Sequence, residues 1–208
     1  SNENNVDILE NVVEKEICIE FKNVSFRYPG ADEDVISNVS FKALPGETTA
    51  FIGSTGSGKS TLINLIPRFY DATEGEILID GVNIKNVSQY DLREKIGFIP
   101  QKGLLFSGTI ESNLKYGGDH ISDEDMIKAS EIAQAMEFIN SKEEKFNTEI
   151  AQGGTNVSGG QKQRLALART IITNPEIYIF DEATSNIDVE SEEKIWKAIY
   201  EIAKNKTV

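Results

Sequence analysis

The stretch GSTGSGKS, residues 53–60, constrains the fold more than any other part of the chain. It satisfies the pattern G-x-x-x-x-G-K-[ST] of a phosphate-binding loop. The run ETTAFIG that leads into it predicts a short strand, and STLINLIPRF after it carries apolar residues at helical spacing. Strand, glycine loop and helix therefore form one predicted unit of an α/β core. The alternative is a flexible glycine turn that happens to contain a lysine.

A loop of this kind curls around phosphate groups, so that its N–H groups and the helix N-terminus face the anion. We expect Lys59 to reach the β and γ phosphates of a nucleotide and the Ser60 hydroxyl to ligate Mg²⁺. The nucleotide-binding residues predicted in this segment are Gly53, Ser54, Thr55, Gly56, Ser57, Gly58, Lys59, Ser60 and Thr61.

Two carboxylates follow a short apolar run in IYIFDE, residues 177–182. Four consecutive apolar residues predict a central parallel strand that is buried on both faces. Asp181 comes first after this strand and is the predicted Mg²⁺ partner, through water. Glu182 is then placed to take a proton from a water that attacks the γ-phosphate, a role worth about 10²- to 10⁴-fold in rate. Without the glycine loop, a solvated acidic pair at a strand end would be the better interpretation.

The remaining sequence predicts strands on one side of the glycine loop and helices on the other. Residues 1–16 are polar and acidic and predict a tail or linker end. Strands are predicted at 17–28 and 35–44, the latter followed by a Pro45-Gly46 turn, and a hairpin at 75–84. Residues from about 103 to 157 predict a helical lobe without convincing strands; a helix then runs from Gly160 to Asn174-Pro175, and another covers about 189–204.

Composition excludes some classes of partner. Acidic residues number 34 against 21 basic ones, and the net charge of −13 opposes binding to nucleic acid. No stretch approaches the roughly 18 apolar residues that span a bilayer, so a membrane role would come through a partner or through a part of the protein not shown. Cys18 is the single cysteine; its alternating context predicts a small buried residue rather than a reactive thiol, consistent with a reducing cytoplasm.

A second glycine-rich helix start lies at VSGGQ, residues 157–161. Ser158 and Gln161 fit the capping-box pattern S-x-x-Q, which would mean a well-capped helix and nothing more. Gly159 and Gly160 argue against that simple interpretation. A helix start without side chains exposes bare N–H groups and a positive dipole, which suits a second phosphate contact.

The segments GSTGSGKST, VSGGQKQR and IYIFDEATS, in this order and spacing, resemble the nucleotide-binding domain of ATP-binding cassette (ABC) transporters. The likeness covers nearly all of residues 17–208. It implies a P-loop NTPase (RecA-like) α/β core with an antiparallel β subdomain and an inserted α-helical subdomain. ATP and Mg²⁺ are the implied cofactors, and residues 1–16 would be the linker from a membrane domain.

In that family two domains meet head to tail, and the signature motif of one closes over the ATP held by the other. The resemblance therefore assigns Ser158, Gly159, Gly160 and Gln161 to the nucleotide of a second cassette, identical or different. Tyr28 corresponds to the aromatic residue that stacks on adenine, although a core tyrosine is the alternative from composition. Gln101 corresponds to the glutamine that contacts Mg²⁺ and the attacking water. SNID, residues 185–188, resembles the loop that links the two sites, with Asn186 where a small apolar residue is common.

Three further segments, RFYDATEGEILIDG, YDLREKIGFIPQ and LLFSGTIESNL, resemble the exporter branch of the family. The implied function is ATP hydrolysis that powers export by a transmembrane domain, on the cytoplasmic side of the cell membrane. Gln152 stands where exporters usually carry a Glu that faces the membrane domain. The family's switch histidine would follow Val208, and His120 is predicted to be a solvated loop residue, so we expect little turnover from residues 1–208 alone.

Two other functions fit the same motifs less well. ABC ATPases of DNA repair place a very long coiled coil between the two glycine-rich segments, whereas about a hundred residues separate them here. A cassette that binds ATP but hydrolyses it weakly, as one half of a heterodimeric exporter, is the third hypothesis. The intact Glu182 and SGGQ argue against it.

Overall fold

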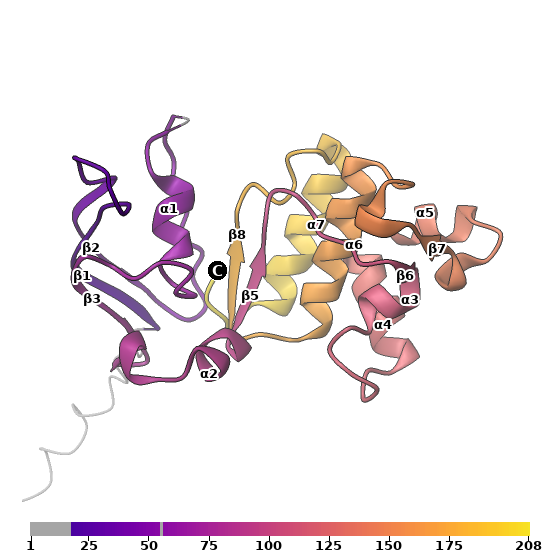
Figure 1. Ribbon diagram of the computed structural model, residues 1–208. Helices are drawn as coiled ribbons and strands as arrows, with labels where there is room; N and C mark the ends of the chain where they lie inside the picture. Colours follow the sequence, from indigo (N-terminus) through magenta and orange to yellow (C-terminus); the bar gives the residue numbers. More distant parts are fainter. Residues whose placement is uncertain (1–17, 55) are drawn as a thin grey trace, which may run out of the picture. The chain divides into compact units, whose positions relative to one another are not determined.

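The computed structural model describes residues 18–54 and 56–208 (Figure 1). The predicted tail at 1–16, Ile17 and the nucleotide-binding candidate Thr55 lie outside the described residues. The chain divides into two compact units, the N-terminal unit, up to Val87, and the C-terminal unit, from Ser88 to Lys206.

The N-terminal unit is built on a four-stranded antiparallel sheet in the order β2-β1-β3-β4. Its strands are β1 (Ile19–Phe26), β2 (Ile36–Ala43), β3 (Glu74–Ile79) and β4 (Val82–Asn83), followed by a 3-10 turn, η1 (Ile84–Asn86). The turn between β3 and β4 consists of Asp80 and Gly81, both with positive φ, which is the geometry that favours a two-residue hairpin. The predicted strands and hairpin of this part of the chain are confirmed.

The predicted helix after the glycine loop is present as α1 (Lys59–Asn64), whereas the predicted strand in ETTAFIG is wrong. Residues 47–53 form no strand, although they are apolar enough to suggest one. A strand needs ladder hydrogen bonds to a neighbour. Within this unit the sheet ends at β2 and β4 without pairing to that run, and Ile52 is 96% exposed.

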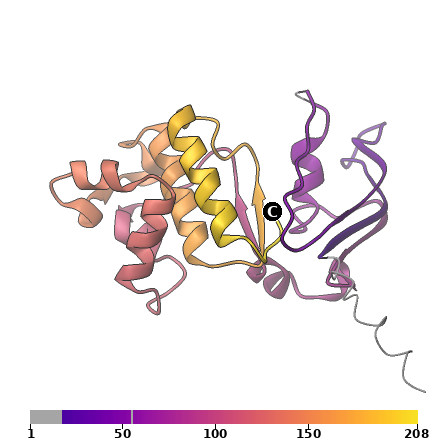
Figure 2. The ribbon, with the colours of Figure 1, turned by 180° about the vertical axis from the view of Figure 1, so that it is seen from behind.

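The C-terminal unit contains the parallel pair β5 (Ile96–Ile99) and β8 (Ile177–Phe180). Ile177, Tyr178 and Ile179 are all buried, as the continuous apolar run predicted. Helix α6 (Gly159–Ile172) precedes β8 and ends two residues before Asn174, and α7 (Val189–Ile202) follows β8. Figures 1 and 2 show α6 and α7 beside the two strands.

Shorter elements complete this unit. They are α2 (Gln89–Glu94), α3 (Ile110–Leu114), α4 (Asp123–Ile132), α5 (Met136–Ser141), the 3-10 turns η2 (Lys145–Asn147) and η3 (Gln152–Gly154), and the antiparallel pair β6 (Gly108–Thr109) and β7 (Glu149–Ile150). The expectation of no strands in the helical segment missed β6 and β7, because two-residue strands are too short to show a period. One core joins β5, β8 and the helices α3 to α7, with Ile110, Leu165, Leu167, Ile195 and Ile199 fully buried.

Three smaller predictions can also be compared with the structure. Cys18 is buried, as expected. His120 is exposed in a turn, as expected of a loop residue. Among the described residues, no helix combines the length and apolar character that crossing a bilayer requires.

Candidate functional site

The glycine loop at 53–61 closes into a tight turn before α1. Gly56 and Gly58 have φ values of +84° and +90°, a conformation that glycine adopts without steric cost. The Ser57 amide donates to the Ser54 carbonyl at 3.1 Å. A Cβ atom on Gly53 would lie 2.6 Å from the Ser57 hydroxyl oxygen, so a side chain at 53 would require the Ser57 side chain to turn away. Glycines in such a loop allow the close backbone approach that a bound phosphate requires.

Lys59 projects back over the same loop. Its Nζ donates a hydrogen bond to the Gly53 carbonyl at 2.6 Å, which spans the two ends of the loop. An ammonium group is thus held at the loop that leads into α1. The arrangement combines a cation with oriented amides, which fits the phosphates of a nucleotide.

Tyr28 lies next to the glycine loop rather than far from it. Its hydroxyl is 2.8 Å from the Thr61 hydroxyl on α1. Its half-buried ring meets Phe26 and Tyr70 edge-on, with centroid distances of 4.8 and 5.3 Å. The structure therefore brings Tyr28 and Thr61 together within the N-terminal unit. The ring also has a packing role, as the core interpretation of this tyrosine expected.

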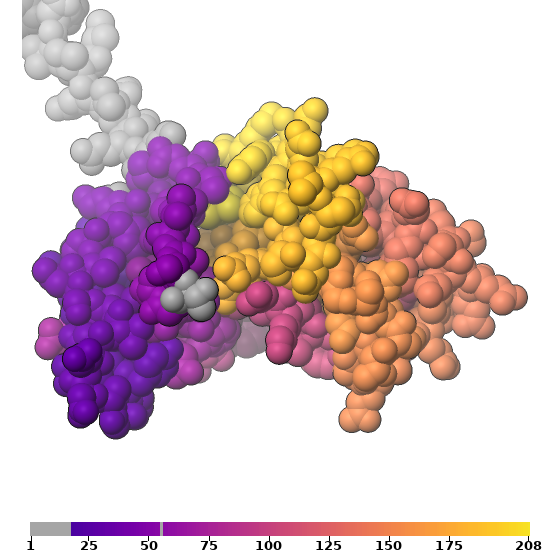
Figure 3. Space-filling view, turned by 90° about the horizontal axis from the view of Figure 1, so that it is seen from above, coloured from indigo at the N-terminus to yellow at the C-terminus, as the bar shows by residue number. Residues whose placement is uncertain are grey.

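The second group of predicted residues lies at one edge of the C-terminal unit. Strands β5 and β8 are parallel, so Gln101, which follows β5, and Asp181, which follows β8, come from the same edge. The Asp181 amide donates to the Ile99 carbonyl at 3.0 Å. Figure 3 views this edge from above, where the pink loop after β5, the orange start of α6 and the yellow loop before α7 adjoin one another.

Glu182 has an unusual backbone. Its φ is +49°, in the left-handed region that non-glycine residues seldom occupy. Its carbonyl accepts a hydrogen bond from the Ser185 amide at 3.1 Å, which closes a turn. Such a conformation persists only where surrounding contacts enforce it, and it is more frequent at functional sites than elsewhere.

Gln163 is a residue that the sequence analysis did not select. Its side chain reaches from α6 to the loops after β5 and β8, and it is only 1% exposed. Nε2 donates to the Gln101 carbonyl at 2.7 Å and to the Ser185 hydroxyl at 3.1 Å, while Oε1 accepts from the Asn186 amide at 2.9 Å. One signal could have found it: helical spacing places this amide one turn before the buried Leu167, and a buried amide needs partners.

The start of α6 is capped as the pattern S-x-x-Q predicts. The Ser158 amide donates to Gln161 Oε1 at 3.0 Å, and the Gln161 amide donates to Ser158 Oγ at 3.2 Å. The first two N–H groups of α6, those of Gly159 and Gly160, have no acceptor within the helix. The structure thus contains both the capping box and the amides that the phosphate hypothesis requires.

The glycines of this helix start also have a steric reason inside the chain. A Cβ on Gly160 would lie 2.7 Å from the Asn186 carbonyl oxygen, and a Cβ on Gly159 would lie 3.3 Å from Asn186 Nδ2. The loop before α7 therefore packs against bare backbone. Glycine at 160 is explained by this packing alone, so it is not by itself a sign of a phosphate contact.

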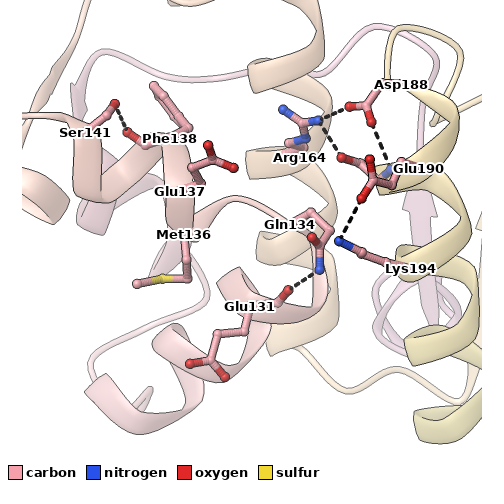
Figure 4. Close-up of a pocket in the computed structure, with 11 residues that line it drawn as sticks. Glu131, Gln134, Met136, Glu137, Phe138, Ser141, Arg164, Asp188, Glu190 and Lys194 are labelled. Atoms are coloured by element: carbon pink, nitrogen blue, oxygen red, sulfur yellow. Dashed lines mark hydrogen bonds and ion pairs between the residues drawn. The ribbon is translucent and has the colours of Figure 1, made fainter.

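Asp188, at the end of SNID, caps α7 and pairs with α6 (Figure 4). Oδ2 accepts from the Ser191 amide at 2.9 Å, and Oδ1 accepts from Arg164 at 2.8 Å. The hydrogen bonds from Ser191, and then the charge of Arg164, lower the pKa of the Asp188 carboxyl. These groups line one side of a polar cavity of about 720 Å³ that also contacts α5 through Met136 and Phe138.

The predicted residues thus form two groups. Tyr28 and the described part of the 53–61 loop belong to the N-terminal unit, whereas Gln101, Ser158–Gln161, Asp181 and Glu182 belong to the C-terminal unit. Within the latter, Gln163 connects Gln101 with the loop that begins at Glu182. In the described part of the chain, no three His, Cys, Asp or Glu side chains gather as a self-sufficient metal site.

A family model described as ABC transporter matches residues 36–185. The match includes the glycine loop, Gln101, the start of α6 and the Asp181-Glu182 pair. It covers well over half of the chain.

Curated relatives match almost the whole chain. The ATP-dependent lipid A-core flippase of Haemophilus influenzae is 48% identical over 191 residues, which are 91% of this chain and 32% of the flippase. Multidrug resistance protein 1 of Entamoeba histolytica is 46% identical over 193 residues, 91% of this chain and 15% of that protein. The chain therefore spans a third or less of the length of these relatives.

A solved structure of a bacterial Atm1-family ABC exporter with ATP bound resembles this fold with a TM-score of 0.87. The two are 39% identical in sequence, and the match covers 92% of this chain and 34% of the exporter chain. Both the sequence and the fold thus match one part of longer proteins.

Proposed function

The chain belongs to the ABC transporter family and has the P-loop NTPase fold of its ATPase domain. From this premise we propose that the chain is a cassette that binds and hydrolyses ATP to power export by a membrane transporter. One observation carries the proposal: the segment that matches the family contains both the glycine loop, with Lys59 hydrogen-bonded across it, and the Asp181-Glu182 pair at the end of β8. The curated relatives described above are named as an ATP-dependent flippase and a multidrug resistance protein, which supports export as the purpose.

The N-terminal unit supplies nucleotide binding in this proposal. The amides of residues 53–61 and the ammonium of Lys59 hold the phosphates, and Tyr28 stacks on the adenine. The restrained loop geometry supports this role, because glycine at 53, 56 and 58 leaves room for close approach of an anion. The Thr55 part of the assignment lies outside the described residues.

The C-terminal unit supplies the hydrolytic groups. Ser60 of the other unit, Gln101 and Asp181 would hold Mg²⁺, and the bound metal would neutralise charge on the β and γ phosphate oxygens. Glu182 accepts the proton of the attacking water, and Gln101 orients that water. The left-handed backbone at Glu182 supports a functional role, because such conformations concentrate at active sites.

A second cassette completes each site in the proposal. Ser158, Gly159, Gly160 and Gln161 contact the γ-phosphate of the ATP held by the partner, which is an identical or a different cassette. The two N–H groups at the start of α6 support this, since neither has an acceptor in the helix. We further propose that 17–208 is the cassette, with its helical lobe at about 103–157, that 1–16 is the linker from a transmembrane domain, and that the cassette lies on the cytoplasmic side of the cell membrane.

Two substitutions separate binding from hydrolysis, both measured in the protein at its natural length. Lys59→Ala should abolish ATP binding, because the cation above the loop is lost. Glu182→Gln should keep ATP affinity and lose turnover, because the amide cannot accept the proton. Binding is measured by titration with ATP and turnover by release of phosphate.

The matched controls are Lys128→Ala on α4 and Glu94→Gln on α2, both exposed and outside the proposed site. Both should bind and hydrolyse ATP as the unmodified protein does. Retained ATP binding in Lys59→Ala would refute the assignment of phosphate binding to residues 53–61. Unchanged turnover in Glu182→Gln would show that Glu182 is not the general base.

A further inference from the structure

The Gln163 amide occupies a position in the core where an apolar side chain would be expected. It lies on the buried side of α6 with Leu167, and both are at most 1% exposed. Burying an amide is unfavourable unless its donors and acceptor find partners. Both the oxygen and the nitrogen of this amide have hydrogen-bond partners, so the role of Gln163 must lie in these hydrogen bonds.

The orientation of this amide is fixed by its neighbours. The Asn186 N–H group can only donate, so Oε1 of Gln163 must face it at 2.9 Å. The Gln101 carbonyl can only accept, so Nε2 must face it at 2.7 Å. The remaining hydrogen of Nε2 lies near the Ser185 hydroxyl at 3.1 Å and, more weakly, the Glu182 carbonyl at 3.5 Å. A single side chain thus bridges two loops that are far apart in the sequence.

The backbone packing around Gln163 points to the same junction independently. A Cβ on Gly103 would lie 2.5 Å from the Lys162 carbonyl oxygen, so the loop after Gln101 runs directly against the backbone of α6. On the other side, Gly160 meets the Asn186 carbonyl in the same way. Glycine at both positions lets the two loops approach α6 closely enough for the Gln163 side chain to reach them.

The Glu182 backbone depends on this junction. Its positive φ must be held by surrounding contacts. Within the turn from Glu182 to Asn186, the Ser185 amide donates to the Glu182 carbonyl. The Gln163 side chain contacts the same turn at the Glu182 carbonyl, the Ser185 hydroxyl and the Asn186 amide. The direction in which Glu182 leaves the end of β8 is therefore set in part from α6.

We propose that Gln163 is a positioning residue for ATP hydrolysis, whose buried amide aligns the backbones of Gln101 and Glu182 with each other and with the start of α6. This inference rests on the proposed function, because Gln101 and Glu182 have their hydrolytic roles only there. Gln163 itself is buried, and its hydrogen bonds are to the backbones of Gln101, Glu182 and Asn186 and to the Ser185 hydroxyl. It acts on the hydrolytic step and not on ATP affinity, since the glycine loop at 53–61, which is proposed to bind the phosphates, belongs to the N-terminal unit.

The test uses steady-state hydrolysis and equilibrium ATP binding in the protein at its natural length. Gln163→Met keeps the side-chain volume and removes donor and acceptor without adding charge. Gln163→Glu keeps an acceptor for the Asn186 amide but replaces the donor to the Gln101 carbonyl. Misplacing a reacting group by about 1 Å can cost roughly 10²-fold in rate, so kcat should fall about 10- to 100-fold in both variants. The ATP dissociation constant should stay within about twofold of the unmodified value.

Ser130→Ala is the matched control. Ser130 is fully buried, and its hydroxyl bonds only within α4, to the Met126 carbonyl at 2.7 Å. This control loses a buried hydrogen bond in the same unit and should keep kcat and ATP affinity. Gly103→Ala is a second variant: it moves the Gln101 loop away from α6 without altering the Gln163 side chain, and it should lower kcat with ATP affinity retained.

Three results would overturn the inference. One is a kcat of Gln163→Met close to that of the unmodified protein. Another is a parallel loss of kcat and ATP affinity in the Gln163 variants, which would report loss of the fold rather than of alignment. The third is an equal loss of kcat in Ser130→Ala. By contrast, absence of ATP hydrolysis in the unmodified protein would refute the proposed function itself.

Discussion

Replacing Gly160 by alanine tests how the loop before α7 is held against α6. The added Cβ would lie 2.7 Å from the Asn186 carbonyl oxygen, closer than non-bonded atoms tolerate. The backbone fixes the position of the Cβ, and the Asn186 oxygen is itself a backbone atom, so neither can rotate away. Gly159 provides the matched comparison, because its Cβ would meet only the end of the Asn186 side chain, at 3.3 Å.

The expected magnitude follows from two opposing effects. Alanine favours a helix by up to about 1 kcal/mol over glycine, and both positions gain part of this. Overpacking against rigid neighbours costs about 1–3 kcal/mol, and only Gly160→Ala incurs it. Gly160→Ala should therefore lower the free energy of unfolding by about 1–2 kcal/mol, whereas Gly159→Ala should leave it unchanged or slightly raised.

Urea denaturation of the 208-residue chain measures this difference. Trp196, the single tryptophan, packs on Phe180 with a ring centroid distance of 4.8 Å and so reports on the C-terminal unit. Equal or greater stability of Gly160→Ala than of Gly159→Ala would refute the reasoning, because it would mean that Asn186 does not lie against α6 as described.

Three further predictions concern the same unit. Asn113→Ala should lower the free energy of unfolding by about 1–3 kcal/mol in urea denaturation. This 2% exposed amide bonds the Phe106 amide and carbonyl, which would lose that partner, whereas the Thr109 carbonyl, its third partner, keeps the Ser112 hydroxyl. Unchanged stability would contradict this. Burial raises the pKa of Tyr178 to about 12, above its value in the unfolded chain. The resulting stabilisation of the fold, roughly 2–3 kcal/mol, is fully present below about pH 10 and is lost between pH 10 and 12. Tyr178→Phe should remove that part of the pH dependence, and an identical alkaline profile would contradict the prediction. The pKa of the Asp188 carboxyl is lowered, so its stabilising effect is present above about pH 4 and is lost as the carboxyl protonates at lower pH. Asp188→Asn should lower the thermal midpoint at pH 7 and weaken the dependence of that midpoint on pH in the acid range. Differential scanning fluorimetry can check both effects.

The sequence was sufficient for features that depend on local chemistry. Alternation along 17–28 predicted β1, the apolar run before Asp181 predicted β8, and S-x-x-Q predicted the capping box that Ser158 and Gln161 form. Each follows from side-chain periodicity or from a hydrogen bond between residues three positions apart. The family resemblance, confirmed by the match to residues 36–185, rests on motifs of this local kind.

Features that depend on distant segments were missed or misjudged. The strand predicted in ETTAFIG is absent because pairing, not apolar content, makes a strand. Gly160 has a packing role that the sequence did not indicate, because a Cβ there would lie 2.7 Å from the Asn186 carbonyl oxygen, 26 residues further along. Gln163 was overlooked because its partners, Gln101 among them, are brought to it only by the fold. Helical spacing could mark Gln163 as buried, but a single sequence does not show which distant segments approach it.

The mass of the Glu182→Gln chain in solution, measured by light scattering with and without Mg-ATP, tests the central claim most directly. Because ATP would be retained between two cassettes, we expect the mass to double on addition of Mg-ATP. Ser158→Arg should cancel that change, since its side chain would block the amides at the start of α6. If the chain binds ATP and keeps the mass of a single chain, closure of two identical cassettes over their nucleotides is contradicted.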